Sequence, residues 1–113
     1  MIEILHNNRC RKSREGLEYL QHTGKEFEVI EYLKHPISEG ELIEILKKLK
    51  ISPLELVRKN EAIWKSDYKN RDLTDAQIIK AMVDNPKLIE RPVVINGSKA
   101  VIARPSERID DLL

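Results

Sequence analysis

Hydrophobic and polar positions in the first third of the chain predict a strand, a helix and a second strand. Residues 2–6 alternate apolar and polar side chains over a length typical of a strand. Residues 8–22 place leucines on one helical face and lead to Gly24, a residue type that commonly ends helices. A second apolar stretch covers residues 27–33. A strand, a helix and a strand of these lengths predict two parallel strands joined by a right-handed crossover.

The pattern changes at His35-Pro36, after which the chain is predicted to be mostly helical as far as residue 86. Ser38 with Glu41, and Thr74 with Gln77, have the spacing of a capping box, in which each side chain bonds the other's backbone N–H. Helices are therefore expected over 39–50, from Ser52-Pro53 to about Val57, around 61–67, and from Thr74 to Asn85.

Residues 92–96 return to strand composition and end in Asn96-Gly97, a strong signal for a tight hairpin turn. Residues 100–103 supply the returning strand, and Pro105-Ser106 can begin a last short helix. The predicted architecture is α/β, with a small mixed sheet built from a βαβ unit and then a ββα unit. A helical insertion at 36–86 separates the two, within one domain that spans 1–113, a length suited to one core.

Composition and charge narrow the classes of function. The 113 residues are 41% hydrophobic and 35% charged, which predicts a folded and highly soluble protein. The formal net charge of +1 gives no reason to expect nucleic acid or a membrane as partner. No apolar run has the length of a membrane span, and no signal peptide is visible. A single cysteine fits a reducing compartment, so a cytoplasmic monomer is expected.

That cysteine, Cys10, is the main candidate for chemistry. It lies where the first predicted strand gives way to the first predicted helix. Unpaired backbone N–H groups at a helix N-terminus favour a negatively charged sulfur, and the thiolate is the form that attacks electrophiles. Four cations lie close by in sequence: Arg9, Arg11, Lys12 and Arg14. The alternative is a buried and inert cysteine, a common fate of this residue type.

Four short motifs along the chain resemble the glutaredoxin-coupled arsenate reductase family, whose fold is thioredoxin-like. They are His6-Asn7-x-x-Cys10-x-x-Ser13-Arg14, Arg58-Lys59-Asn60, Arg91-Pro92-Val93 and Arg104-Pro105-Ser106. The match covers nearly the whole chain, in order and with similar spacing. Asn8 and Arg9 stand where the family commonly has a proline and a small residue.

The resemblance implies roles for the residues around the cysteine. Cys10 is expected to be the nucleophile, and Ser13, at the place of the second cysteine of a Cys-x-x-Cys pair, to hydrogen-bond its thiolate. His6 is expected to tune the sulfur, since an imidazolium nearby favours the thiolate. Ser13 and His6 also suit ordinary structural roles. No metal is expected, because His22 and His35 lack ligand spacing.

The resemblance also assigns an oxyanion site to Arg58, Arg91 and Arg104. Guanidinium groups suit tetrahedral oxyanions, because their planar forks make paired, charge-assisted hydrogen bonds. Arg91 and Arg104 flank predicted strands and can converge on the sheet end that carries the Cys10 loop. Pro92 is expected beside that loop, with the resemblance implying a cis Arg91-Pro92 bond. Asn7 also matches the motif, and a turn or cap role suits it equally well.

The activity implied is reduction of arsenate to arsenite, with no bound cofactor. Cys10 would attack arsenic, glutathione or another low-molecular-weight thiol would reduce the ester, and glutaredoxin would complete the cycle. Because the chain has no second cysteine, an external thiol is needed to restore Cys10. One alternative is a glutathione-dependent reductase of protein mixed disulfides. Another is an Spx-type regulator that binds RNA polymerase, although Ser13 removes the Cys-x-x-Cys switch of such proteins.

Overall fold

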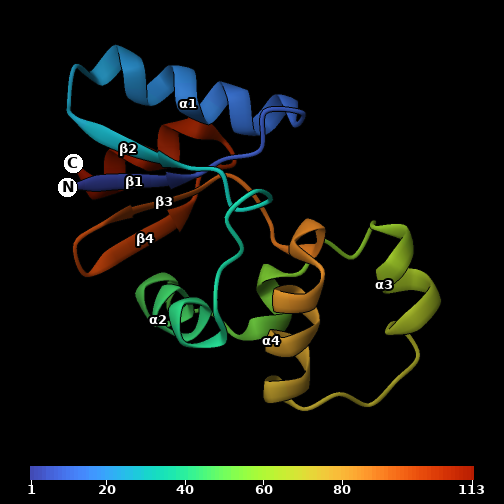
Figure 1. The fold of residues 1–113 in the computed structure, drawn as a ribbon. Coiled ribbons are helices and arrows are strands. Elements are labelled where there is room, and N and C mark those ends of the chain that lie inside the picture. Colours follow the sequence, from blue (N-terminus) through green and yellow to red (C-terminus); the bar gives the residue numbers. More distant parts are fainter. The chain divides into compact units, whose positions relative to one another are not determined.

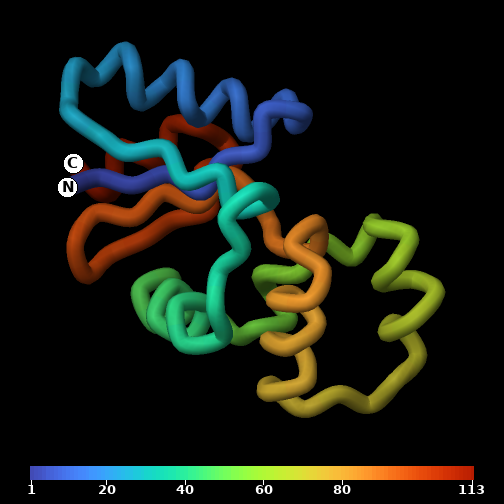
Figure 2. The backbone as a smooth tube through the Cα atoms, viewed as in Figure 1, coloured from blue at the N-terminus to red at the C-terminus, as the bar shows by residue number.

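The computed structural model describes residues 1–113, and its contacts divide the chain into two compact units. The first unit contains Met1–His35 and Arg91–Leu113, and the second contains Pro36–Glu90. The tube in Figure 2 follows the chain out of the first unit and back into it.

The first unit is a four-stranded mixed sheet with helices, in the order β2-β1-β3-β4 (Figure 1). Its elements are β1 (Ile2–Leu5), α1 (Arg11–Thr23), β2 (Phe27–Ile30), β3 (Val93–Asn96), β4 (Lys99–Ile102) and the 3₁₀ helix η3 (Ser106–Leu112). β1 pairs in parallel with β2 and antiparallel with β3, which pairs antiparallel with β4. This is the α/β, thioredoxin-like arrangement that the sequence predicts.

Two glycines allow the chain to turn at the ends of these elements. Gly24 ends α1 with a positive φ of 73° and donates its N–H to the carbonyl of Gln21. Gly97 has a φ of 62° in the turn between β3 and β4, which confirms the hairpin predicted from Asn96-Gly97. Left-handed backbone of this kind is open to glycine at little cost.

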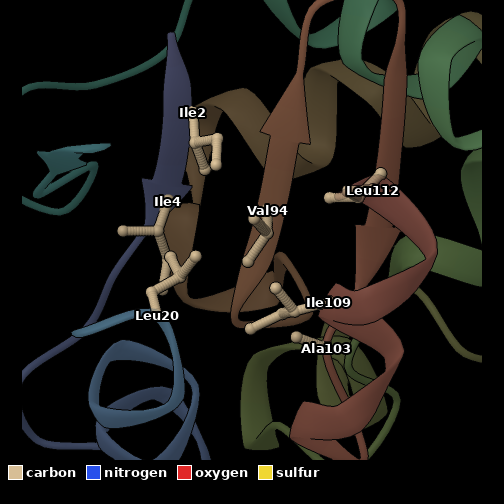
Figure 3. Packing of buried hydrophobic residues seen from close by; sticks show 7 residues of the cluster. All are labelled: Ile2, Ile4, Leu20, Val94, Ala103, Ile109 and Leu112. Carbon is tan, nitrogen blue, oxygen red and sulfur yellow. The ribbon is translucent and has the colours of Figure 1, made fainter. Parts of the chain in front are cut away.

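Apolar side chains from one face of the sheet form the core of this unit together with α1 and η3. Ile2 and Ile4 of β1 and Val94 of β3 point toward Leu20 of α1 and toward the C-terminal segment (Figure 3). Seven buried residues make up the cluster: Ile2, Ile4, Leu20, Val94, Ala103, Ile109 and Leu112. Burial of such side chains contributes about 1.5–3 kcal/mol each. The core therefore fixes α1, and with it the loop from β1, against the sheet.

The second unit is helical, as the sequence predicts for this part of the chain. It contains α2 (Glu39–Leu49), η1 (Pro53–Leu56), α3 (Ala62–Asp67), α4 (Asp75–Asp84) and η2 (Pro86–Leu88). α4 packs against α2, η1 and η2. Complete capping boxes begin α2 and α4, through Ser38 with Glu41 and Thr74 with Gln77. None of the helices in the structure is long and apolar enough to span a membrane.

Three predicted boundaries differ from the structure. The second strand ends at Ile30 and not near Leu33, because the backbone turns there, with the N–H of Lys34 bonding the carbonyl of Glu31. α1 begins at Arg11, because residues 7–10 form a turn. β4 covers Lys99–Ile102 and not residues 100–103. The last segment is a short helix as predicted, of the 3₁₀ type. The prediction of one domain with an insertion at 36–86 stays a prediction.

Candidate active site

Cys10 is the N-cap residue of α1, directly after the loop that leaves β1. Its backbone is extended, with φ −96° and ψ 121°, and its carbonyl accepts the N–H of Arg14 in the first helical turn. The thiol is free and half-buried, and the first turn carries no acidic residue. The first N–H groups of a helix have no partner within the helix and bear a partial positive charge. The sulfur therefore lies at a position where a bound anion is favoured.

Three of the four cations next to Cys10 in sequence have other partners in the structure. Arg11 and Lys12 both pair with the Glu15 carboxylate, at 3.4 and 3.5 Å, on the exposed side of the helix. Arg14 donates to the backbone carbonyl of Asn8 at 2.9 Å. The sequence does not predict these partners, which lie on the helix surface and at the loop backbone.

Ser13 and His6 form a buried pair beneath the loop. Both are almost fully buried, with 0% and 2% of their surface exposed. The Nδ1 atom of His6 lies 2.8 Å from Ser13 Oγ, which also accepts the backbone N–H of Asn7 at 2.9 Å. These bonds hold the end of β1 against the first turn of α1. The bond from Ser13 to the Cys10 thiolate, which the family resemblance implies, stays a prediction.

Asn7 shapes the loop itself. Its side-chain Oδ1 accepts the backbone N–H of Arg9 at 2.9 Å, and its carbonyl accepts the N–H of Cys10 at 3.0 Å. Asparagine side chains favour turns through bonds of this kind. The turn role considered for Asn7 is therefore present in the structure.

Arg91, Pro92 and Arg104 lie at the sheet end that carries the Cys10 loop. β1 ends at Leu5, which is paired with Val93 at the start of β3, and Val93 is paired with Ile102 at the end of β4. The ladder continues one residue further, where the Ala103 N–H bonds the Pro92 carbonyl at 2.9 Å. Arg91 and Arg104 are the next residues beyond this pair, so their backbones lie beside each other.

The Arg91-Pro92 bond is cis, as the resemblance implies, and the Arg104-Pro105 bond is cis as well. Arg91 is buried, with 6% of its surface exposed, and Arg104 is half-buried. Two arginines held largely out of solvent at this edge differ from the solvated arginines elsewhere on the surface, such as Arg11.

Arg58 belongs to the second unit and has two acidic partners there. Its Nη1 atom lies 3.2 Å from Glu61 and its Nε atom lies 3.3 Å from Glu90. Backbone bonds between Arg58 and Leu88, and between Glu90 and Leu56, hold these segments together. Sequence reasoning did not foresee the two carboxylates. The role of Arg58 toward an oxyanion stays a prediction.

A pocket of about 270 Å³ opens beside His6 in the first unit. Its lining includes Asn8, Arg9, Glu31 and Lys34. The sequence singled out Asn8 and Arg9 only as departures from a family pattern, and it gave Glu31 no role. A signal for Glu31 exists, since it follows β2, and the parallel neighbour β1 ends at the same sheet edge.

Comparison with known proteins assigns the family. A sequence model described as the ArsC family matches residues 5–112. This chain belongs to the ArsC family.

Individual ArsC relatives match the chain along nearly its full length. It is 41% identical over 114 residues to a Haemophilus influenzae protein named arsenate reductase, an alignment that covers 99% of this chain and 98% of that protein. It is 42% identical to the uncharacterized protein YfgD of Escherichia coli, with 99% and 96% covered. A solved structure named arsenate reductase from Vibrio cholerae has a TM-score of 0.94 at 34% identity, and the match covers 99% of this chain and 97% of that one.

Proposed function

We propose that this protein reduces arsenate to arsenite, with Cys10 as the nucleophile and with glutathione and glutaredoxin as the reducing thiols. The observation that carries the proposal is a free, half-buried cysteine at the N-cap of α1, at the same sheet end as Arg91 and Arg104, in an ArsC-family chain. Proteins similar to it over their full length bear the name arsenate reductase. A dithiol or metal mechanism has no comparable support in these residues.

The first step is formation of a sulfur–arsenic bond. Arsenate is held by the positive N-terminus of α1 and by guanidinium groups, which stabilise charge on its oxygens. The Cys10 thiolate attacks arsenic(V), and one arsenate oxygen leaves as water after taking up protons. The product is a covalent thiol–arsenate ester on Cys10.

The next steps deliver two electrons. Glutathione bonds to arsenic as a second arsenate oxygen leaves as water. A glutaredoxin thiol then attacks the glutathione sulfur, so that the electron pair of this sulfur–arsenic bond stays on arsenic and a glutathione–glutaredoxin mixed disulfide forms. Water then cleaves the bond between Cys10 and arsenic(III), which releases arsenite and the Cys10 thiol. In balance, arsenic acid and two thiols give arsenous acid, one mixed disulfide and one water. Because Cys10 returns as a thiol, it acts as a nucleophilic catalyst and not as a net reductant.

The test is arsenate-dependent oxidation of NADPH in an assay coupled through glutathione, glutaredoxin and glutathione reductase. We expect wild type to turn over and Cys10→Ser to be inactive. Arg104→Ala should raise the KM for arsenate by about ten-fold or more, the size of one lost charge-assisted hydrogen bond. Arg108→Ala, an exposed arginine four residues away, is the matched control and should behave as wild type.

The opposite result is equally clear. Folded wild-type protein that shows no arsenate-dependent rate with several glutaredoxins and thiols would rule out the proposal. The same samples should then be assayed with glutathionylated protein substrates, because the Cys10 site also suits thiol–disulfide exchange.

A further inference from the structure

A chain of hydrogen bonds connects the end of β2 to the first turn of α1 through His6. Glu31 Oε1 accepts the side-chain Nδ2–H of Asn8 at 3.1 Å. Asn8 Oδ1 lies 2.6 Å from His6 Nε2, and His6 Nδ1 lies 2.8 Å from Ser13 Oγ. The parallel pairing of β1 with β2, continued by the bond from the His6 N–H to the Ile30 carbonyl, brings Glu31 beside the loop.

The donors and acceptors in this chain determine which way each group points. An ionised carboxylate only accepts hydrogen bonds, so the Asn8 amide must turn its NH₂ group toward Glu31. Lys34 Nζ lies 3.6 Å from the same Glu31 oxygen. The Asn8 carbonyl oxygen then faces His6 Nε2, and because that oxygen only accepts, Nε2 must carry a proton.

Because Nε2 carries a proton and bonds Asn8, the other ring nitrogen, Nδ1, is the one that bonds Ser13. In neutral His6, Nδ1 has a lone pair and accepts the Ser13 hydroxyl proton. In the imidazolium, Nδ1–H donates to Ser13 Oγ, and the single Ser13 proton becomes available to another acceptor. Ser13 Oγ also accepts the Asn7 N–H in either case. The direction of the Ser13 hydroxyl therefore depends on the tautomer and charge of His6.

We propose that Asn8 is a positioning residue for the chemistry at Cys10: bonded to Glu31, it holds His6 with Nε2 protonated and Nδ1 directed at Ser13. A third group that orients the partner of a nucleophile is a general feature of activated nucleophiles. A proline at position 8 has no side-chain oxygen for this task. The inference rests on the proposed role of Cys10 as the nucleophile, but not on arsenate as its substrate.

Two measurements that need no arsenate test the proposal. Nitrogen NMR of the His6 ring reports which nitrogen bears the proton. The rate of alkylation by iodoacetamide across neutral pH reports the reactivity of Cys10, the only cysteine in the chain. The other charged groups around the His6 pocket are Arg9, Glu31 and Lys34, with Arg14 bonded to the Asn8 carbonyl.

We expect Asn8→Ala to shift His6 away from the Nε2–H tautomer and to lower the alkylation rate by about ten-fold, as for loss of one hydrogen bond to a buried group. Asn8→Asp alone keeps an acceptor for Nε2–H but has no donor for Glu31, so it is combined with Glu31→Gln, whose amide can donate to the new carboxylate. This double variant should retain the tautomer and recover most of the rate. Asn70→Ala, an exposed asparagine in the second unit, is the control for the substitution itself.

An unchanged His6 tautomer and an unchanged alkylation profile in folded Asn8→Ala would overturn the proposal. Loss of rate in both Asn8→Ala and the double variant Asn8→Asp with Glu31→Gln, with the tautomer retained, would also overturn it, since the acceptor would then not be the cause. Absence of arsenate turnover in wild type, with the expected tautomer and alkylation results, would remove the proposed substrate and leave the role of Asn8 standing.

Discussion

At the scale of single residues, Ser13 connects two segments whose positions define the site. Its hydroxyl bonds the ring of His6 and the backbone of Asn7, and all three residues are buried. A buried backbone N–H without a partner costs about 1–3 kcal/mol, more than the net contribution of a typical hydrogen bond. Ser13 therefore stabilises the loop that carries Cys10, independently of its predicted hydrogen bond to the Cys10 sulfur.

Replacing Ser13 by alanine should lower the free energy of unfolding by about 1–3 kcal/mol, because it removes the partner of the Asn7 N–H and of His6 Nδ1 at once. Urea unfolding of wild type and Ser13→Ala measures the difference. Ser98→Ala, at an exposed position in the β3–β4 turn, is the control and should change stability little. Equal unfolding midpoints for Ser13→Ala and wild type would show that water replaces these bonds at no cost.

At the scale of elements, the sequence correctly predicts the helix starts and the hairpin turn that short local motifs determine. α2 and α4 begin where their capping boxes place them, and the hairpin turns at Gly97. The end of β2 was misplaced, because a turn closed by backbone bonds has no distinctive side chains. The ion pair of Arg58 with Glu90, and the bond between Glu31 and Asn8, join residues distant in sequence. Such contacts depend on strand pairing, which apolar periodicity does not reveal.

The contact between α1 and β3 gives a second test, at Gly16. A Cβ atom added there would lie 2.6 Å from the Cγ of Pro92, in a rigid ring. Gly16→Ala gains about 1 kcal/mol of helix propensity, but overpacking costs about 1–3 kcal/mol, so we expect net destabilisation. Because Pro92 and α1 both border the site, Cys10 alkylation should change as well.

Gly40→Ala is the matched control for this experiment. Gly40 also lies in a helix, α2, but a Cβ there meets nothing within 4 Å. We expect a stability equal to or above wild type, by up to about 1 kcal/mol. If both variants moved the urea midpoint in the same direction, the close approach of Pro92 would not explain the stability change in Gly16→Ala.

At the scale of the whole molecule, the first unit is closed by a contact between residues far apart in the chain. The Tyr19 hydroxyl of α1 donates to Asp110 of η3 at 2.7 Å, and both segments carry core residues. This hydrogen bond raises the pKa of Tyr19 above its ordinary value of 10.0, with burial and the charges of Asp110 and Glu107 adding to the effect.

A raised pKa in the folded state predicts the direction of the pH dependence. The stabilisation from Tyr19 is fully present below pH 10.0, its unfolded value, and is lost as the pH rises through the higher folded value. The unfolding temperature of wild type should therefore fall more steeply above that pH than the unfolding temperature of Tyr19→Phe. The unfolding temperature of Asp110→Asn should fall less steeply with pH than that of wild type, since the amide keeps an acceptor without the charge. Parallel curves for wild type and Tyr19→Phe would contradict this assignment.

The pairing of β1 with β3 across the intervening Pro36–Glu90 segment also has a consequence for biosynthesis. A ribosome makes Cys10 long before Arg91 and Arg104, so the nascent chain carries the free thiol while the other segments at this sheet end do not yet exist. Strand pairs distant in sequence close slowly, because a long loop must be ordered first. During that interval, the incomplete sheet edge and the thiol are open to chaperones and to oxidants.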